Sequence, residues 1–560
     1  MNRICQSAIL LSLAVGAGCT HDRPLAVDLQ DHVKRPEHAA ILLFADGVRR
    51  ETFRHLLEAG KLPNIKKHLV DRGTTVRNAV SCLPTVTYAN TVTFLTGRFP
   101  GHHGITGNRF FDRYRLLLRD YTFIKTYQQV DHEFIAPTLY ELLEDKYTVS
   151  IQCAARRGAT RTIDNWATSG INWFFGEIDN VDKLTTIRFE MIADAANRIG
   201  CWPEFIHAYF PALDETGHRF GVDSPQYAAA MINLDVQIGR IVHAINKAGM
   251  MDRTFLCFVS DHGMAPTPRD NCIDLARVLR NRFNLSVIDK PVEVSADSFN
   301  QAPSNYWKLF DKFASCSAVV TVDGSREAAI HLRYDRTWRT LPEDVTEIGV
   351  YTAGPTSDPP PTATHLAEHL AALPAVQLAA VRAGANRVRL FTRTGRGDIE
   401  RRLVDGRKRY RYRSSDAPDA LGLRTHPPAA KLIDGQFHTR DQWLAATIAT
   451  NAPDLIGQLP EMFDSHRSGQ VVLFAAPNWD FSPRDIAGHG SILPDDMYVP
   501  MILAGPGIPA GAAIDAGRTC DVMPTLLELL GCQDRLAGAG PIDGVSLVER
   551  IRQAVIPLGP

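Results

Sequence analysis

Continuous apolar runs, each followed by an acidic residue, recur along the N-terminal half of this chain. The runs and the acids behind them are residues 39–45 with Asp46, 205–210 with Asp214, and 254–260 with Asp261. Apolar runs of this length without alternation are typical of strands that are buried on both faces of a parallel sheet. Each strand would then deliver a carboxylate near its carboxyl end, which is the edge where open α/β sheets bind ligands.

Helix-like segments alternate with these runs. Residues 225–250 carry apolar side chains at helical spacing along one face. Residues 138–144 resemble a short helix, and residues 147–153 resemble a further strand. This alternation predicts an α/β fold with a doubly wound, mostly parallel sheet and helices on both of its faces.

The alternating pattern loosens in the second half of the chain and then returns. The looser part predicts a strand at 328–334, a short helix at 364–373 and an antiparallel meander at 387–413. The core pattern then resumes with strands at 469–475 and 497–503 and a helix at 521–530. We therefore predict that a smaller α+β capping region is inserted into the sheet domain.

The predicted meander is rich in positive charge. Between Arg382 and Arg413 the chain carries twelve Lys or Arg residues and three acidic residues. Strand alternation places many of these charges on one side, so a solvated sheet face is one explanation. A local surface for anion recognition is the other, and the sequence leaves the role of the meander open.

The composition is that of an ordinary globular protein. Hydrophobic residues make up 45% and charged residues 22% of the 560 residues, and the formal net charge is −1. No overall field therefore draws the protein to a nucleic acid polymer or to an anionic membrane, and any polyanion site must be local. The eight cysteines beyond residue 19 are scattered without C-x-x-C pairs, so no disulfide connectivity follows.

The N-terminus has the pattern of an export signal. A basic start at Arg3 precedes an apolar run that is too short to span a bilayer comfortably. The run ends at Cys19 in a segment that resembles the lipobox of bacterial lipoproteins, although Gly16 stands where that motif usually has Leu. We predict a periplasmic protein or one that an acylated Cys19 anchors to the bacterial cell envelope, with no other membrane association. Ordinary signal cleavage near Ala17 is the alternative.

Acidic and histidine residues near the predicted strand ends suit a zinc centre. Asp214 and His218 are four residues apart, so one helical turn or a tight loop would bring both side chains to one ion. Asp261 and His262 are neighbours at a strand-to-loop junction, where their side chains can converge. The two remaining candidates are Asp46 and His489. Six ligands suit two ions with three protein ligands each and with positions open for a nucleophile and a substrate.

A hydroxyl-rich stretch, residues 82–108, contains the candidate nucleophile, Thr87. A threonine hydroxyl is a weak nucleophile at neutral pH, so something must stabilise its alkoxide. Two cations about 4 Å apart would hold this oxygen, bind a phosphoryl oxygen and neutralise the leaving oxygen. A separate general base is then not required.

Five motifs occur here in the order found in the alkaline phosphatase superfamily. They are Asp46-Gly47, the stretch from Pro84-Thr-x-Thr87 to His103-Gly104-Ile105, Asp214-x-x-Gly217-His218, Asp261-His262-Gly263-Met264 and His489-Gly490. Within that superfamily the chain most resembles the type I phosphodiesterase/nucleotide pyrophosphatase family. The resemblance implies an alkaline phosphatase-like fold and a two-zinc hydrolase of phosphodiester or pyrophosphate bonds, in which Thr87 is transiently phosphorylated.

The resemblance also implies roles for single residues. One zinc would be held by Asp214, His218 and His489, and the other by Asp46, Asp261, His262 and the Thr87 oxygen. Asn108 matches the family's asparagine that binds a non-bridging phosphoryl oxygen. Tyr209 stands where the well-known alkaline phosphatases have an acid for a third ion, so no third Mg²⁺ site is expected.

Some positions depart from the family pattern. Tyr88-Ala89 replaces the usual Phe-Pro after the nucleophile, which leaves base stacking open. Ala155 replaces a Lys that related monoesterases use, which favours a diester substrate, although Arg156 can substitute. A phosphomonoesterase and an inactive envelope binding protein that keeps the fold stay as alternatives. A sulfatase is rejected, because Cys82 lies five residues before the position of the sulfatase cysteine, which falls on Thr87.

The periodicity and the resemblance together divide the chain into five parts. These are a signal peptide (1–18), a tether (19–38), the first part of a catalytic core (39–265), an insertion or capping region with the meander (266–468) and the second part of the core (469–560). The expected substrate is a small phosphodiester or nucleotide and not a nucleic acid polymer. Residues 155–185, with Trp173 to Phe175, and the insertion are expected to recognise the leaving group. The natural substrate and the oligomeric state do not follow from the sequence.

Overall fold

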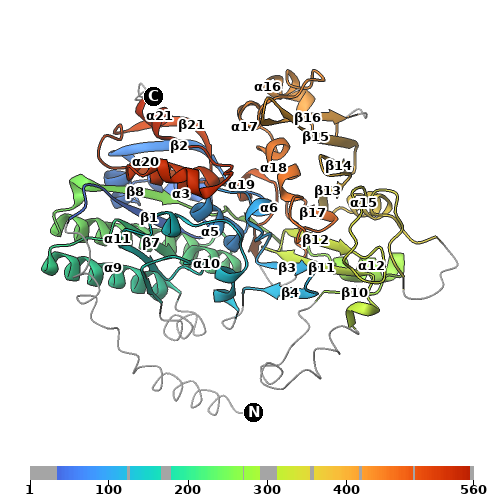
Figure 1. Cartoon of the computed structure of the whole chain (residues 1–560), viewed down its shortest axis with the longest axis horizontal. Helices are drawn as coiled ribbons and strands as arrows, with labels where there is room; N and C mark the ends of the chain where they lie inside the picture. Colours follow the sequence, from blue (N-terminus) through green and yellow to red (C-terminus); the bar gives the residue numbers. More distant parts are fainter. Residues whose placement is uncertain are drawn as a thin grey trace, which may run out of the picture.

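Two large β-sheets organise the described part of the chain (Figure 1). The computed structural model describes residues 35–554, except for 123–125, 165–177, 269, 290–311, 353–358, 415–418 and 483–485. The predicted signal peptide and most of the predicted tether lie outside these residues. None of the helices that the structure describes is long and apolar enough to cross a membrane.

The first sheet has nine strands, and its centre consists of the strands that the apolar runs predict. In sheet order the strands are β19 (Tyr498–Val499), β2 (Gly73–Val80), β20 (Met501–Ala504), β8 (Thr254–Val259), β1 (Ala39–Ala45), β7 (Phe205–Phe210), β5 (Thr148–Ile151) and β6 (Arg161–Ile163), with β21 (Ala512–Arg518) also beside β2. Five of its eight pairings are parallel, and the antiparallel ones all involve β2 or β20. The prediction of a mostly parallel sheet is confirmed.

Helices cover both faces of the first sheet (Figure 1). One face packs against α3 (Arg50–Glu58), α9 (Asp179–Ile199) and α11 (Pro225–Lys247). The other packs against α5 (Thr87–Thr96) and α20 (Val522–Leu529). Side chains of β1 alternate between these layers, with Leu43 in one and Leu42 in the other, and both are fully buried. Burial on both faces explains why the strand reads as an unbroken apolar run.

The second sheet has eight strands and contains the predicted meander. In sheet order the strands are β10 (Val287–Ile288), β11 (Ala318–Asp323), β12 (Glu327–Leu332), β17 (Val471–Ala475), β13 (Val376–Arg382), β14 (Arg387–Phe391), β15 (Arg396–Val404) and β16 (Arg407–Ser414). The antiparallel pairing of β14, β15 and β16 confirms the meander. One face packs against α15 (Ala363–Ala371). The other packs against α17 (Arg440–Thr447) and α18 (Leu455–Met462).

The strand predicted at residues 469–475 forms as β17, but it does not lie in the first sheet. It pairs antiparallel with β12 and with β13 in the middle of the second sheet. This differs from the expectation that the core pattern resumes at residue 469, and the chain re-enters the first sheet only at β19. An apolar run predicts a buried strand, whereas its choice of sheet depends on partners that are distant in sequence.

The remaining described elements connect or flank the two sheets. They are α4 (Pro63–Ile65), η1 (Lys66–Val70), α6 (Pro100–His103), β3 (Arg109–Asp112), β4 (Leu117–Asp120), η2 (Tyr127–His132), α7 (Leu139–Leu142), α10 (Ala212–Phe220), η3 (Met251–Arg253), β9 (Ala265–Pro266), α12 (Leu275–Phe283), η4 (Leu423–Thr425), α16 (Pro427–Ala430), β18 (Ala487–Gly488), α19 (Pro494–Met497), η5 (Thr519–Asp521), η6 (Gln533–Ala539) and α21 (Val548–Arg552). Helix α6 touches α18, which packs on the second sheet. Helix α10 contains Asp214 and His218 of the site described below.

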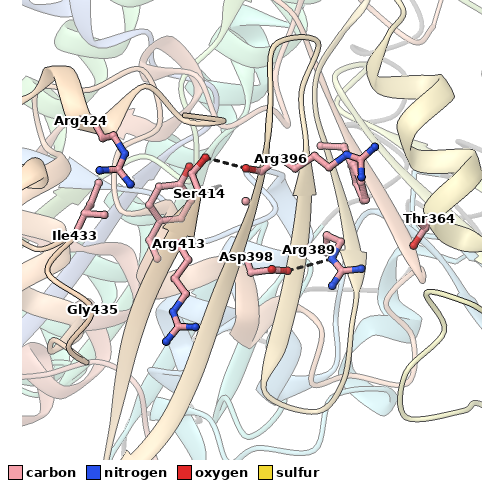
Figure 2. A pocket seen from close by; sticks show the side chains of 12 residues that line it. Thr364, Arg389, Arg396, Asp398, Arg413, Ser414, Arg424, Ile433 and Gly435 are labelled. Atoms are coloured by element: carbon pink, nitrogen blue, oxygen red, sulfur yellow. Dashed lines mark hydrogen bonds and ion pairs between the residues drawn. The ribbon is translucent and has the colours of Figure 1, made fainter. Parts of the chain in front are cut away.

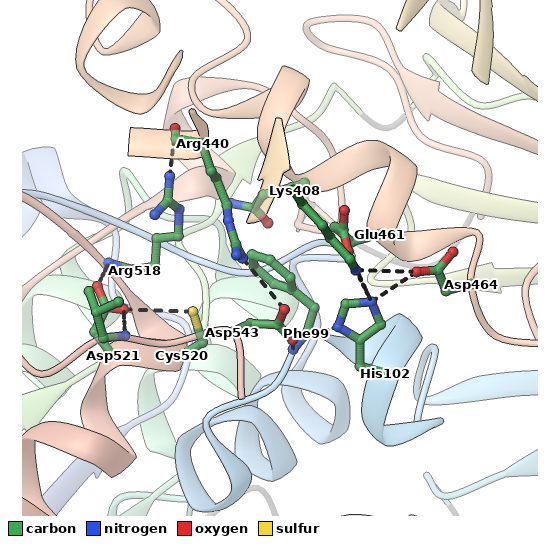
Figure 3. A network of polar contacts seen from close by, with 12 residues as sticks. Phe99, His102, Lys408, Arg440, Glu461, Asp464, Arg518, Cys520, Asp521 and Asp543 are labelled. Carbon is green, nitrogen blue, oxygen red and sulfur yellow. Dashed lines mark hydrogen bonds and ion pairs between the residues drawn. The ribbon is translucent and has the colours of Figure 1, made fainter. Parts of the chain in front are cut away.

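A network of charged side chains joins α6 to the second sheet's helix α18 (Figure 3). His102 on α6 lies between three carboxylates: its Nδ1 is 2.5 Å from Asp543, and its Nε2 is 3.0 Å from Glu461 and 2.9 Å from Asp464. The ammonium group of Lys408 contacts Glu461 and Asp464 as well. The cluster is therefore an ion-pair network between the two halves of the molecule.

We predict that His102 stabilises the folded protein at neutral pH and that this stabilisation is lost at alkaline pH. Burial lowers the pKa of His102, but hydrogen bonds to Asp464, Asp543 and Glu461 outweigh this and raise it to about 10. Because an unfolded histidine titrates near 6.5, this stabilisation is complete below about pH 6.5 and is lost as the pH rises through about 10.

The measurement is urea unfolding of the His102→Ala variant across this pH range. At pH 6 the variant should lose about 2 kcal/mol of unfolding free energy, since hydrogen bonds between charged groups are removed. The loss should shrink as the pH rises from about 6.5 to about 10. His55→Ala, which removes an exposed histidine on α3, is the matched control. It should leave the unfolding free energy unchanged at both pH values. A loss that is the same at pH 6 and pH 10 would contradict the prediction.

Candidate active site

The predicted acidic residues meet at one edge of the first sheet. Strands β7, β1 and β8 are parallel neighbours, so their carboxyl ends lie together. Asp46 follows β1 directly, Asp261 lies two residues beyond β8, and Asp214 is in the first turn of α10, which begins just after β7. Parallel pairing thus brings together three carboxylates that are far apart in the sequence.

The three predicted histidines point their Nε2 atoms at these carboxylates. His218 lies one helical turn after Asp214, and its Nε2 is 3.4 Å from Asp214 Oδ1. The Nε2 of His489 is 3.6 Å from the same oxygen. The Nε2 of His262 is 3.4 Å from Asp46 Oδ1 and 3.2 Å from Asp261 Oδ2. All six predicted ligands therefore converge on one place.

Backbone carbonyls fix the tautomer of each histidine. The Nδ1 atoms of His218, His262 and His489 lie 2.8, 2.8 and 2.9 Å from the carbonyl oxygens of Ala487, Gly263 and Thr85. A carbonyl only accepts hydrogen bonds, so each Nδ1 carries a proton, and Nε2 is the nitrogen left to present a lone pair when the ring is neutral. This is the arrangement in which histidine binds metal ions.

The carboxylate oxygens that face these lone pairs lack donors. Asp46 Oδ1, Asp214 Oδ1 and Asp261 Oδ2 are buried and have no hydrogen-bond partner within the described ranges. The opposite oxygens of two of them are satisfied, since Asp46 accepts from the Tyr209 hydroxyl and Asp261 accepts from the Gly47 N–H at 3.2 Å. Buried oxygens that face only lone pairs are strongly unfavourable unless a cation lies between them.

The electrostatics lead to the same conclusion. Burial, and then the nearby carboxylates of Asp261 and Asp214, raise the pKa of Asp46 well above its usual value. The site contains two groups of potential metal ligands, and within each group the ligand atoms all lie within 4.8 Å of one another. One group is Asp214, His262 and His489, and the other is Asp46, Asp261 and His262. His262 belongs to both, whereas His218 adds to the first group through Asp214. The mixed nitrogen and oxygen donors and the unsatisfied oxygens fit divalent cations such as zinc.

Thr87 is the first residue of helix α5 and faces this cluster. Its Oγ1 lies 3.2 Å from His262 Nε2. The N-terminus of a ten-residue helix carries a partial positive charge and free amide groups, which favour an alkoxide and a phosphoryl group. The predicted nucleophile is therefore placed where an oxyanion is stabilised.

Asn90 holds the loop that leads into α5, a role that the sequence motif alone did not indicate. Its Nδ2 donates to the carbonyls of Cys82 and Pro84 at 2.9 and 3.0 Å, and its Oδ1 accepts from the Cys82 N–H at 3.0 Å. The side chain is fully buried. Its position three residues after Thr87 was visible in the sequence, but its partners depend on the folded loop.

Asn108 lies beside the start of the same helix. Its Oδ1 accepts a hydrogen bond from the Tyr88 N–H at 2.9 Å. This contact orients the amide so that Nδ2 is its remaining donor group. The Tyr88 ring stacks on Tyr121 with ring centroids 5.0 Å apart, so one of its faces is covered by protein.

The turn between β11 and β12 brings the second sheet into contact with the site, which the sequence did not predict. The His489 N–H donates to the Gly324 carbonyl at 2.7 Å. Asp323 Oδ1 accepts from the Arg109 N–H at 2.9 Å, next to Asn108. The predicted leaving-group residues Trp173 to Phe175 lie outside the described residues.

Residues 40–346 match the family model described as type I phosphodiesterase / nucleotide pyrophosphatase. The chain belongs to this family. An uncharacterized pyrophosphatase/phosphodiesterase of Schizosaccharomyces pombe is 28% identical over 265 residues, which are 45% of this chain and 49% of that protein. The bis(5'-adenosyl)-triphosphatase enpp4 of Xenopus laevis is 24% identical over 257 residues, which are 45% and 53% of the two chains.

Solved structures of the family share the fold. Murine ectonucleotide pyrophosphatase / phosphodiesterase 5 superposes with a TM-score of 0.54 at 15% identity, over 92% of this chain and 100% of that one. A second structure of the murine protein is an inactive variant in complex with AMP. The sequence matches to the curated relatives are partial: this chain spans about half the length of the relatives it matches. The predicted family and the alkaline phosphatase-like fold are confirmed.

We predict that removal of divalent cations destabilises the protein. A chelator should lower the melting temperature, because a cation that binds only the folded state adds to its stability. Zinc should restore the melting temperature, as measured by calorimetry. Asp261→Asn should bind fewer ions than the wild type by elemental analysis and should respond less to the chelator. Asp252→Asn, at an exposed position, is the control, and an equal metal content in both variants would contradict the prediction.

Proposed function

We propose that this chain is a two-zinc hydrolase of phosphodiester or pyrophosphate bonds that acts through a phospho-threonine intermediate on Thr87. The observation that carries the proposal is the convergence of three unsatisfied carboxylate oxygens and three histidine Nε2 atoms beside Thr87 Oγ1. Family membership supports the same reaction class. The names of relatives refer to pyrophosphatases, phosphodiesterases and a bis(5'-adenosyl)-triphosphatase, so we propose a small phosphodiester or nucleotide as substrate.

We assign one zinc ion to each end of the cluster of carboxylates and histidines. Asp214, His218 and His489 would hold one zinc, and Asp46, Asp261, His262 and the Thr87 oxygen would hold the other. When bound, such ions supply Lewis-acid stabilisation of the threonine oxygen and of the phosphoryl and leaving oxygens. The Tyr209 hydroxyl donates to Asp46 where other superfamily members have an acid, which supports a site without a third Mg²⁺ ion.

The protein's own groups would carry out the reaction in two displacements. The Thr87 oxygen attacks phosphorus, the bond from phosphorus to the leaving oxygen breaks, and Thr87 becomes phosphorylated. A water molecule then attacks the phosphorus, and the bond to the Thr87 oxygen breaks. The Nδ2 group of Asn108, oriented by Tyr88, donates to a non-bridging phosphoryl oxygen in both steps.

The surroundings of the site favour a diester over a monoester. A monoester carries an additional negative charge, which related monoesterases meet with a Lys and an Arg. Here Ala155 is fully buried, and Arg156 pairs with Asp164 at 2.9 Å. Arg156 is therefore already neutralised by a carboxylate, which supports the diester proposal over the phosphomonoesterase alternative.

We also propose that the chain is exported and is held at the bacterial cell envelope through an acylated Cys19. The support is the sequence pattern of the N-terminus. Incorporation of labelled palmitate into the wild type, and its loss in Cys19→Ser, would test the anchor. Equal labelling of the two proteins would contradict it.

We predict that Thr87→Ala abolishes turnover and that the wild type prefers diesters. Hydrolysis of bis(p-nitrophenyl) phosphate and of p-nitrophenyl phosphate is measured for each protein. The variant should lose more than about a thousandfold in kcat, because it lacks the hydroxyl that is proposed to form the covalent intermediate. Thr87→Ser should keep part of the activity.

The control is Thr340→Ala, which removes an exposed threonine in the part of the chain that joins β12 to α15. It should hydrolyse both esters like the wild type. Unchanged hydrolysis by Thr87→Ala would contradict the proposed nucleophile. A strong preference of the wild type for the monoester would contradict the diester proposal.

A further inference from the structure

One face of the outer strands of the second sheet carries eight of the meander's twelve Lys and Arg residues. The register places Arg389 of β14 beside Asp398 of β15, and Asp398 beside Arg413 of β16. By strand alternation this face carries Arg387, Arg389, Arg396, Arg402, Arg407, Arg409, Arg411 and Arg413. The opposite face, with residues such as Ile399, is buried under α17 and α18. The expectation that strand alternation places many of the charges on one side agrees with this register.

A pocket of about 580 Å³ lies where these strands meet neighbouring segments (Figure 2). Four arginines line it, namely Arg389 of β14, Arg396 of β15, Arg413 of β16 and Arg424 of η4. Among the lining residues, which all belong to the described part of the chain, Asp398 is the single acid. Thr364 of α15 lies on one side of the pocket, and Ile433 and Gly435 lie on the other. The pocket is thus enclosed from two sides and has an excess of positive charge.

Neighbouring carboxylates neutralise only part of this charge. Arg389 Nε is 3.2 Å from Asp398, and Arg396 is 2.8 Å from Glu368. By contrast, Arg413 is 4.0 Å from Glu400, at the limit of an ion pair. Arg424 has no ion pair with any of the residues described. Among the residues described, Arg413 and Arg424 are therefore the least neutralised arginines of the pocket, and Figure 2 shows both on the side of Ile433 and Gly435.

We propose that this pocket binds a small organic molecule that carries two or more phosphate groups. Guanidinium groups bind phosphate through two parallel hydrogen bonds, and several arginines from different segments suit several phosphates. The volume lies within the range of small-molecule sites. Phe391 and Tyr412 add aromatic lining for the organic part of the ligand. A flat membrane surface fits less well, because the walls on both sides enclose the arginines.

The pocket is separate from the candidate active site. The sheet order places β17 and β13 between β12, whose turn contacts the site, and β14, where the pocket begins. At the usual strand spacing, β12 and β14 are therefore roughly 14 Å apart in the plane of the sheet. None of the twelve lining residues is a proposed metal ligand or the nucleophile. The inference therefore does not rest on the proposed hydrolase function.

The test is calorimetric titration of the full chain with α,β-methylene-ADP, a diphosphate whose bridging carbon blocks cleavage of that linkage. The Arg413→Ala/Arg424→Ala variant should lose one binding event or bind it more than about tenfold more weakly, since charge-assisted hydrogen bonds are removed. Binding by the wild type should weaken as salt is raised. Hydrolysis of bis(p-nitrophenyl) phosphate by the variant should equal that of the wild type.

The matched control is Arg336→Ala/Arg339→Ala, which removes the same charge from exposed positions elsewhere in the second half of the molecule. It should bind the diphosphate like the wild type. Equal affinity in all three proteins would overturn the proposal, as would inorganic phosphate that binds as tightly as the diphosphate. Arginine-dependent binding to vesicles of anionic phospholipid without binding of the diphosphate would overturn it in favour of a membrane surface. Because the readout is binding, a chain without hydrolase activity would leave this test intact.

Discussion

The placement of three buried carboxylates at one edge of a parallel sheet is the constraint on which the candidate site depends. Asp46, Asp214 and Asp261 face the Nε2 atoms of three histidines, and their inward oxygens lack hydrogen-bond partners in the described part of the chain. Such an arrangement is unfavourable by itself and becomes favourable around divalent cations. The same cations would activate Thr87. The buried carboxylates that destabilise the site without cations are therefore also the groups that would make its proposed chemistry possible.

The second sheet contributes to this site as well as covering its surroundings. The turn between β11 and β12 accepts a hydrogen bond from the His489 backbone and holds the backbone next to Asn108. On another side, His102 of α6 is held between carboxylates of the second half of the molecule. Because α6 follows α5 after a short turn, this network also restrains the helix that begins at Thr87.

The two anion-binding features of the molecule are built in opposite ways. The candidate active site is a cluster of acids and neutral histidines that requires cations before it can attract a phosphoryl group. The pocket between β14 and η4 uses guanidinium groups directly and needs no ion. Arg156, in contrast, is paired with Asp164 and therefore adds no free positive charge to the active site.

The sequence by itself determined the parallel strands, the acids at their ends, the order of the motifs and the one-sided charge of the meander. These are local properties, because strand periodicity and residue spacing depend only on a few neighbouring residues. Only the tertiary structure decided that β17 joins the second sheet, that His262 lies within reach of both ligand groups and that Arg156 is neutralised. Each of these depends on contacts between residues far apart in the chain, and such contacts follow from how whole elements pack and not from the pattern of any one of them.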